Sequence, residues 1–312
     1  MQIVAIGVGL IKISQGQISL GTLMAAVAFT QDIATPLQGL VGDINSIRSI
    51  KEIVNKINCL STLESQQQKN PMKDYGSSDL IFDHLTIEKD GKRIVNDFSY
   101  NFQSGKKYLI VGPNGSGKSS LCKAIKNHFK DYKGQIIYNS QDLRYINNDD
   151  ISDHISYLTE NVSLFNGTVK DNIILNRNYS EEEYRKVKAE ANVLLKDDHQ
   201  LGENGSKASS GEKRRIEIGR SLLTKPKIML LDEVVSTLDI QTAYEIEKMI
   251  LGYKNHTIIF ISHNFSGKLI SEYDDILVMD HGCLIDSGKY EDLIERCDYF
   301  RNICDIKFGK VL

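Results

Sequence analysis

Residues 112–119 read Gly-Pro-Asn-Gly-Ser-Gly-Lys-Ser, a glycine-rich run that ends in a lysine and a serine. It follows the short apolar segment 107–111, which is expected to be a strand, and it runs into a helix that opens at Lys118. In a strand–loop–helix unit of this kind, glycines allow backbone N–H groups to turn towards phosphate oxygens. The helix N-terminus adds its partial positive charge. The stretch therefore predicts a phosphate-binding loop in an α/β protein.

The residue types in this loop also predict the ligand, which is a nucleotide with its magnesium ion. A lysine at the position of Lys118 reaches the β- and γ-phosphates, and the hydroxyl of Ser119 takes a place on Mg²⁺. A glycine-rich turn without a ligand is the alternative. The residues predicted to contact the nucleotide are Gly112, Pro113, Asn114, Gly115, Ser116, Gly117, Lys118, Ser119 and Ser120.

The overall composition excludes several classes of protein. A net charge of −3 over 312 residues gives no electrostatic case for binding nucleic acid. The five cysteines are scattered without a Cys-x-x-Cys pair, so neither a disulfide framework nor a zinc site is indicated. The N-terminus has no basic region or cleavage site of a secretory signal.

The N-terminal part differs from the rest of the chain because residues 1–11 and 13–31 carry no charge. A membrane span needs about 20 mostly apolar residues, and Leu20–Ile44 is long enough. A buried amphipathic hairpin in a soluble protein is the alternative. The pattern predicts a helix over Asn45–Leu60, and the polar stretch Ser61–Ser78 is expected to be a linker.

Two carboxylates follow another apolar segment, 228–231, in a region where strand-like and helix-like segments alternate. A carboxylate at the end of such a strand lies at the edge of the sheet beside the phosphate loop, so Asp232 is predicted to hold Mg²⁺ through water. Glu233 is placed to orient and deprotonate a water molecule that attacks the terminal phosphate. Both residues could instead be ordinary strand-end caps.

A histidine follows the β-branched segment 257–261. His263 at that edge can hydrogen-bond the γ-phosphate and fix the base and the water. A lone histidine is more often structural, but its position after the loop and the two carboxylates favours a role in the site.

With these residues the chain resembles the ATP-binding cassette family, specifically exporters with fused membrane and nucleotide-binding domains. Gly112–Ser119 matches the Walker A motif and Leu230–Glu233 matches Walker B. Ser236–Asp239 matches the D-loop, and His263 matches the switch histidine. In this family two cassettes close head to tail around two ATP molecules, and each ATP lies between the Walker motifs of one subunit and the signature motif of the other.

The resemblance implies an α/β P-loop NTPase fold with a RecA-like core, an antiparallel β subdomain and a helical subdomain. The cassette match runs from Asp79 to about Cys304, and Gly16–Leu23 looks like the outer turn into the last membrane span of an exporter. The expected domains are a transmembrane remnant over 1–60, a linker over 61–78 and the cassette over 79–312. The implied location is the plasma membrane, in contact with lipid, with the cassette in the cytoplasm. Exporters of this family carry six spans per subunit, so the resemblance implies that further transmembrane helices lie either in a missing part of the chain or in a pore encoded elsewhere.

The signature motif departs from the family pattern Leu-Ser-Gly-Gly-Gln, because residues 208–212 read Ala-Ser-Ser-Gly-Glu. Ser209 and Gly211 are kept, and with Asp239 they are expected to contact nucleotide. Ser210 adds a side chain where the backbone should approach phosphate, and Glu212 places a negative charge at the same helix N-terminus. We expect the half-site that this chain offers to a partner to be weakened.

Two more positions depart from the pattern. The Q-loop glutamine is replaced by Glu160, which has nearly the same shape and can still face Mg²⁺ and the nucleotide. The aromatic residue that usually stacks on adenine should lie around 87–89, where the sequence has Ile-Glu-Lys. Loss of one stacking contact would cost on the order of 1 kcal/mol.

The resemblance implies an ATP-hydrolysing subunit of an exporter that uses ATP and Mg²⁺. Complete Walker motifs beside an altered signature favour a heterodimer with a second half-transporter, and a homodimer remains open. The alternatives are a soluble or regulatory ATPase of the same family and a nucleotide-binding module with little turnover. The cargo is not encoded in this part of an exporter, although resemblance to bacterial half-transporters favours a peptide or bacteriocin.

Overall fold

The computed structural model describes residues 2–25, 28–29, 50, 71–72, 76, 78–129, 131–263 and 265–308. Its contacts divide the chain into two units, Met1–Gln68 and Lys69–Leu312. Apart from residue 50, the predicted helix Asn45–Leu60 lies outside the described residues, as does most of the predicted linker.

In the first unit, helix α1 spans Gln2–Ser14. A turn follows, in which the N–H of Gly16 donates to the carbonyl of Ile13, and a second helical segment starts at Leu20. Among the described residues, no helix combines the length and the apolar character needed to cross a bilayer. Most of the predicted span Leu20–Ile44 lies outside those residues, so the membrane segment stays a prediction.

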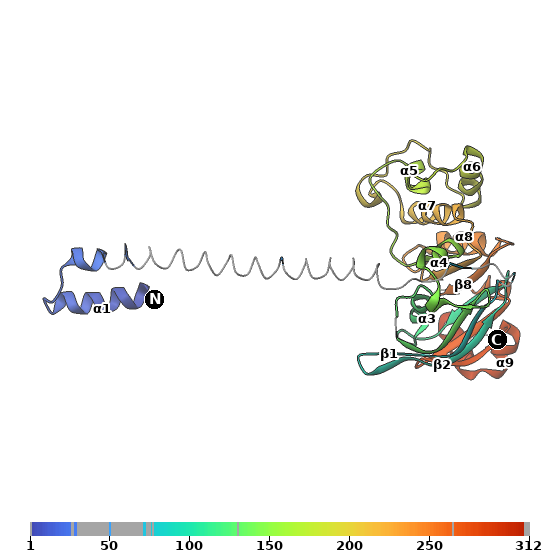
Figure 1. The fold of residues 1–312 in the computed structure, drawn as a ribbon. Coiled ribbons are helices and arrows are strands. Elements are labelled where there is room, and N and C mark those ends of the chain that lie inside the picture. The colour runs from blue at the N-terminus through green and yellow to red at the C-terminus, as the bar shows by residue number, and fades with distance from the viewer. Residues whose placement is uncertain are drawn as a thin grey trace. The chain divides into compact units, whose positions relative to one another are not determined.

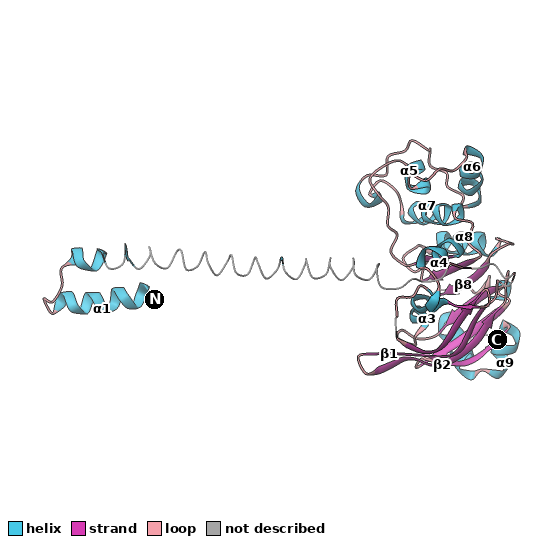
Figure 2. Ribbon diagram, in the orientation of Figure 1, coloured by secondary structure: helices cyan, strands magenta, loops and turns pink. Residues whose placement is uncertain are grey.

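The second unit is built around two sheets, drawn as magenta arrows in Figure 2. The larger sheet has six strands in the order β10-β9-β3-β8-β7-β6. The strands β6, β7, β8, β3 and β9 are parallel, and β10 pairs antiparallel with β9. The strands are β3 (Lys107–Val111), β6 (Ile155–Leu158), β7 (Ile228–Asp232), β8 (Thr257–Ile261), β9 (Asp275–Asp280) and β10 (Cys283–Gly288).

The smaller sheet has four antiparallel strands in the order β2-β1-β4-β5. The strands are β1 (Leu80–Lys89), β2 (Lys92–Phe102), β4 (Tyr132–Tyr138) and β5 (Gln141–Asp142). Its inner face carries an edge-to-face aromatic cluster in which Phe82 packs on Phe98 and Phe102. Such clusters and the β-branched residues between them favour extended strands over helices.

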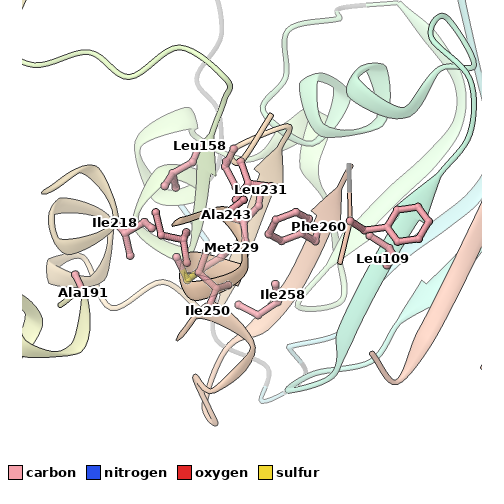
Figure 3. Packing of buried hydrophobic residues seen from close by; sticks show 14 of the residues in the cluster. Leu109, Leu158, Ala191, Ile218, Met229, Leu231, Ala243, Ile250, Ile258 and Phe260 are labelled. Carbon is pink, nitrogen blue, oxygen red and sulfur yellow. The ribbon is translucent and has the colours of Figure 1, made fainter. Parts of the chain in front are cut away.

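Successive side chains of the parallel strands point to opposite faces of the larger sheet, and each face carries its own hydrophobic core. Leu109 and Val111 of β3 belong to one core, and Tyr108 and Ile110 belong to the other. The same period-2 pattern holds in β7 and β8, and every residue of β3, β7 and β8 is buried. Figure 3 shows the first core, where Leu231 and Phe260 lie between the sheet and neighbouring helices.

The remaining helices are α3 (Lys118–Ile125), α4 (Asn148–His154), α5 (Val169–Ile174), α6 (Glu181–Glu190), α7 (Ser210–Leu223), α8 (Ile240–Leu251), α9 (Tyr290–Arg296) and α10 (Asp298–Phe308). Helices α5, α6 and α7 gather at one end of the second unit, apart from β1 and β2 (Figure 1). Each of the three begins with a capping box, in which an N-cap hydroxyl and the acidic residue three positions later satisfy each other's backbone N–H groups.

The predicted α/β fold with three parts is confirmed. The parallel sheet with its flanking helices is the core, the antiparallel sheet is the β subdomain, and α5 to α7 form the helical subdomain. The strands predicted at 107–111, 228–231 and 257–261 are β3, β7 and β8, and the helix opening at Lys118 is α3.

Candidate active site

The loop 112–119 joins β3 to α3, and two of its glycines are required by their surroundings. Gly112 has φ 152° and Gly117 has φ 96°, a region that side-chain-bearing residues rarely adopt. A Cβ on Gly112 would clash with the carbonyl oxygen of Met279, and one on Gly117 would lie 2.6 Å from the carbonyl oxygen of Ile94. The backbone can therefore take this path only with glycine at both positions.

Lys118 lies inside the curve of this loop and is only 4% exposed. Its Nζ donates to the carbonyl oxygens of Gly112 at 2.9 Å and of Pro113 at 2.8 Å. Burial lowers the pKa of Lys118, while the nearby Glu233 and Asp232 carboxylates oppose that shift. Nζ also lies 3.4 Å from Oγ of Ser116. A poorly solvated cation held by neutral oxygens is well prepared to exchange these partners for phosphate oxygens.

Asp232, at the end of β7, is held by two hydroxyl groups. Ser119 Oγ donates to Asp232 Oδ1 at 2.8 Å, and the Tyr157 hydroxyl donates to Asp232 Oδ2 at 2.9 Å. Burial raises the pKa of Tyr157, so this hydroxyl stays protonated and acts as a donor. The structure thus brings together the serine and the carboxylate that the sequence predicts as a pair.

These oxygens suit a magnesium ion. Mg²⁺ prefers oxygen ligands and is usually held by one or two protein groups, with waters and phosphate oxygens completing its octahedron. Among the described residues no group of three or more His, Cys, Asp or Glu side chains could hold a metal. A site of one hydroxyl and one carboxylate beside a phosphate loop therefore fits magnesium carried in with a nucleotide.

Glu233 and His263 form a second pair at the same edge of the sheet. Nδ1 of His263 lies 3.0 Å from Oε1 of Glu233, with side-chain exposures of 47% and 22%. Glu233 has a positive φ of 55°, and its N–H donates to the carbonyl of Ile261 at 2.9 Å. A positive φ at a residue with a side chain is backbone strain, and strain of this kind is common at functional sites.

Residues 95–236 match the family model described as ABC transporter. The chain belongs to the ABC transporter family. It is 35% identical over 225 residues to the Escherichia coli microcin-J25 export ATP-binding/permease protein, covering 70% of this chain and 38% of that protein.

Two further similarities reach across most of the chain. The Lactococcus lactis lactococcin-G-processing and transport ATP-binding protein is 29% identical over 301 residues, 92% of this chain and 42% of its own length. A solved bacterial Atm1-family ABC exporter with ATP bound has a TM-score of 0.69 at 25% identity, covering 97% of this chain and 55% of that one. The chain spans about two fifths of the length of both named relatives.

The Q-loop position of this ABC transporter chain is held through its backbone. Arg214 of α7, only 1% exposed, donates to the carbonyl oxygens of Thr159 at 2.7 Å and Glu160 at 2.6 Å. It also pairs with Glu217 at 2.5 Å. The side chain of Glu160 is exposed, while its main chain is fixed to the helical subdomain.

The altered signature motif forms the N-terminus of α7. Oε2 of Glu212 accepts from both the N–H and the hydroxyl of Ser209, each at 2.8 Å. Gly211 packs against α8, since a Cβ there would lie 2.6 Å from Cγ2 of Thr242. Asp239 caps α8 by accepting from the N–H of Thr242 at 3.0 Å. The signature serine is thus already bonded within its own helix.

Of the three positions around which an adenine-stacking residue is expected, one is buried and two are exposed. Ile87 is fully buried in the core of the smaller sheet, whereas Glu88 and Lys89 are exposed. None of the three supplies an aromatic ring, so a stacking contact on the base has to come from elsewhere or is lost.

Sequence reasoning missed Tyr157 and Arg214. Tyr157 reaches Asp232 because β6 and β7 are parallel neighbours, with Tyr157 opposite Leu230. Arg214 had a visible signal, because it stands three residues after Gly211 and four before Ile218, on the face of α7 that is buried. A charged residue on an apolar helix face marks a buried partner.

Proposed function

We propose that this chain binds ATP with Mg²⁺ and hydrolyses it as the ATP-binding subunit of an exporter. The observation that carries the proposal is the Glu233–His263 pair at the carboxyl edge of the sheet that also bears the phosphate loop. A carboxylate oriented by a neighbouring histidine is the arrangement expected of a general base acting on water. Lys118, Ser119 and Asp232 supply the charges and ligands for the triphosphate.

Lys118, Glu233 and His263 each have a role in the proposed hydrolysis step. Lys118 leaves the carbonyls of Gly112 and Pro113 for the β- and γ-phosphates, and Glu233 accepts a proton from the attacking water. An ionised carboxylate only accepts hydrogen bonds, so Nδ1 of His263 is the donor in the pair. A hydrogen bond from Nε2 to the γ-phosphate would require a proton on both ring nitrogens.

The bound magnesium ion would be held by Ser119 and Asp232, with Glu160 facing it, and would neutralise charge on the phosphate oxygens. Loop residues Asn114, Gly115, Ser116 and Ser120 would complete the contacts to the triphosphate through their backbone N–H groups and hydroxyls.

The direct test is Glu233→Gln in the full chain, within the assembly that hydrolyses ATP. The rate of ATP hydrolysis should fall by about 100-fold or more, as expected for loss of a general base. ATP binding, measured by equilibrium dialysis, should stay within about twofold of that of the unmodified chain. Persisting hydrolysis would mean that the base is assigned wrongly. Glu245→Gln on α8, an exposed glutamate outside the site, is the matched control.

We propose that residues 1–60 belong to a membrane domain, that 61–78 are a linker and that 79–312 are the cassette, with the cassette on the cytoplasmic side of the plasma membrane. The support is the similarity of 92% of the chain to a transport protein and the uncharged N-terminal segment. Extraction of the chain from membranes by alkaline carbonate alone would reject a spanning helix.

We propose that the partner is a different half-transporter rather than a second copy. Glu212 occupies both donors of Ser209, so the signature of this chain is poorly disposed to take a γ-phosphate from a facing subunit. A partner with an uncharged residue at that position would complete the site built on Lys118 and Glu233. Full hydrolysis by this chain alone would count against the heterodimer.

For cargo we propose a bacteriocin-type peptide, on the strength of relatives named for lactococcin G transport and microcin J25 export. In the assembled transporter such peptides should stimulate ATP hydrolysis. No stimulation by peptides, together with stimulation by another class of compound, would reject this cargo.

A further inference from the structure

The loop that carries His263 contacts two helices that lie outside the predicted nucleotide site. It follows β8, and its described residues 263 and 265–267 lie between α8 and α10. Each helix provides one charged side chain that bonds the loop's backbone. These are Glu247 from α8 and Lys307 from the last turn of α10.

Glu247 holds the loop from the α8 side. It is 1% exposed, its Oε2 accepts from the N–H of Ser266 at 3.2 Å, and its Oε1 accepts from the hydroxyl of Tyr273 at 2.9 Å. Tyr273 is itself buried, so both carboxylate oxygens are committed to the protein. A buried, doubly bonded carboxylate leaves the backbone little freedom at Ser266.

Lys307 holds the loop from the α10 side. Its Nζ donates to the carbonyl oxygen of His263 at 2.7 Å and lies 4.3 Å from the ring centroid of Phe265. Phe308, the next residue, packs edge-to-face on Phe265 with ring centroids 5.6 Å apart. The buried side chains of Phe300 and Cys304 anchor α10 in the first core. The backbone from which the Lys307 side chain extends is therefore held in place.

The hydrogen bond from Lys307 to the His263 carbonyl links α10 directly to the residue that contacts the proposed base. Lys307 bonds the main chain of the residue whose ring bonds Glu233, so a shift of that carbonyl moves Nδ1 relative to Oε1 of the base. A misplacement of about 1 Å in a catalytic group can cost roughly 100-fold in rate. Burial lowers the pKa of Lys307 to about 8, with attraction to Glu247 opposing the shift, in keeping with a desolvated ammonium.

We propose that Lys307 is a positioning residue that sets the place of His263 beside Glu233 through the His263 carbonyl, with Glu247 fixing the same loop from its other side. The proposal rests on the proposed function, because it concerns the hydrolysis step. It makes the C-terminal helix α10 part of the site's framework without any contact to nucleotide.

The test compares Lys307→Met with Lys307→Arg in the full chain, within the assembly that hydrolyses ATP. Lys307→Met should lower kcat roughly tenfold with KM for ATP within about twofold, and Lys307→Arg, which keeps a donor, should recover most of the loss. Hydrogen exchange should quicken at residues 265–267 and stay unchanged in the phosphate loop. Lys268→Met, which removes an exposed charge from the neighbouring turn, is the matched control and should leave kcat unchanged.

A double-mutant cycle separates positioning from simple stability. In a His263→Ala background, Lys307→Met should lower kcat by less than about twofold, because there is no longer a ring to misplace. An equal loss in both backgrounds, a loss of ATP binding, or an unchanged kcat in Lys307→Met would each overturn the inference. If the unmodified chain and Glu233→Gln hydrolyse ATP equally, the proposed function itself fails, which is a different result.

Discussion

The hydroxyl of Tyr157 donates to Oδ2 of Asp232 over 2.9 Å, while Ser119 donates to the other oxygen of the same carboxylate. The tyrosine therefore fixes the orientation of the group that is proposed to face magnesium, from a neighbouring strand and without being a ligand. Outer hydrogen bonds of this type orient metal-binding groups and tune their affinity.

Removing this hydroxyl by Tyr157→Phe should raise the Mg²⁺ concentration needed for half-maximal nucleotide binding by about five- to tenfold, the equivalent of one lost hydrogen bond. Titration of nucleotide binding with Mg²⁺ measures the effect without relying on turnover. Tyr132→Phe is the control, because the Tyr132 hydroxyl is buried without a hydrogen-bond partner in the described structure. An unchanged Mg²⁺ dependence in Tyr157→Phe would show that Asp232 needs no such support.

Replacing the loop lysine by Lys118→Met should weaken ATP binding by 100-fold or more, since charge-assisted bonds to phosphate are each worth about 1.5–3 kcal/mol. The folded state should persist, because methionine fills the same buried space. Isothermal titration with ATP provides the measurement. Lys123→Met, on an exposed position of the same helix, should bind ATP normally.

The stability of the chain should depend on pH through Glu247. Burial raises the pKa of this carboxyl to about 7 from 4.5, opposed by bonds from Tyr273 and Ser266 and by the charge of Lys307. The folded state then binds more protons than the unfolded state between these values, so the Glu247 contribution is fully present below pH 4.5 and is lost as the pH rises to about 7.

Glu247→Gln should therefore flatten the pH dependence in that window, by up to an amount on the order of 3 kcal/mol. Denaturant unfolding of both proteins at several pH values measures the difference. Exposed Glu272 provides the control as Glu272→Gln. Parallel curves for Glu247→Gln and the unmodified chain would contradict the raised pKa.

Glu212→Gln should raise hydrolysis several-fold in any assembly where the signature of this chain faces an ATP. The change removes a negative charge from the helix N-terminus at a cost of about 0.5 kcal/mol in stability. Glu183→Gln is the control variant for Glu212→Gln, because Glu183 makes the same capping box with Ser180 at the start of α6. Equal effects of the two changes on hydrolysis would show that the charge at position 212 is not what limits the site.

The strands and the phosphate loop could be predicted because each has a local signature. The apolar runs that became β3, β7 and β8 are bounded by polar residues, and the glycines of 112–119 meet local steric demands. The order of the strands is a different matter. β8 lies between β3 and β7, so His263 emerges between the phosphate loop and Asp232, and that order depends on long-range pairing.

The contacts that sequence reasoning missed all join distant segments. Tyr157 and Asp232 are 75 residues apart, and Lys307 is 44 residues from His263. Such pairs are fixed by strand register and by how deeply a helix is anchored, which depend on the whole core. The N-terminal prediction stays open, because Leu20–Ile44 lies mainly outside the described residues.

The complete burial of β3, β7 and β8 determines where the sequence can change during evolution without loss of folding. The substitutions in the Q-loop and the signature motif lie outside these strands: Glu160 and Ser210 are exposed, and Glu212 is half-buried in the first turn of a helix. Substitutions there can accumulate without loss of folding, whereas the strands tolerate few changes. Catalytic competence can therefore decay in a lineage while expression level and thermal stability stay constant, so abundance of such a chain is no measure of its turnover.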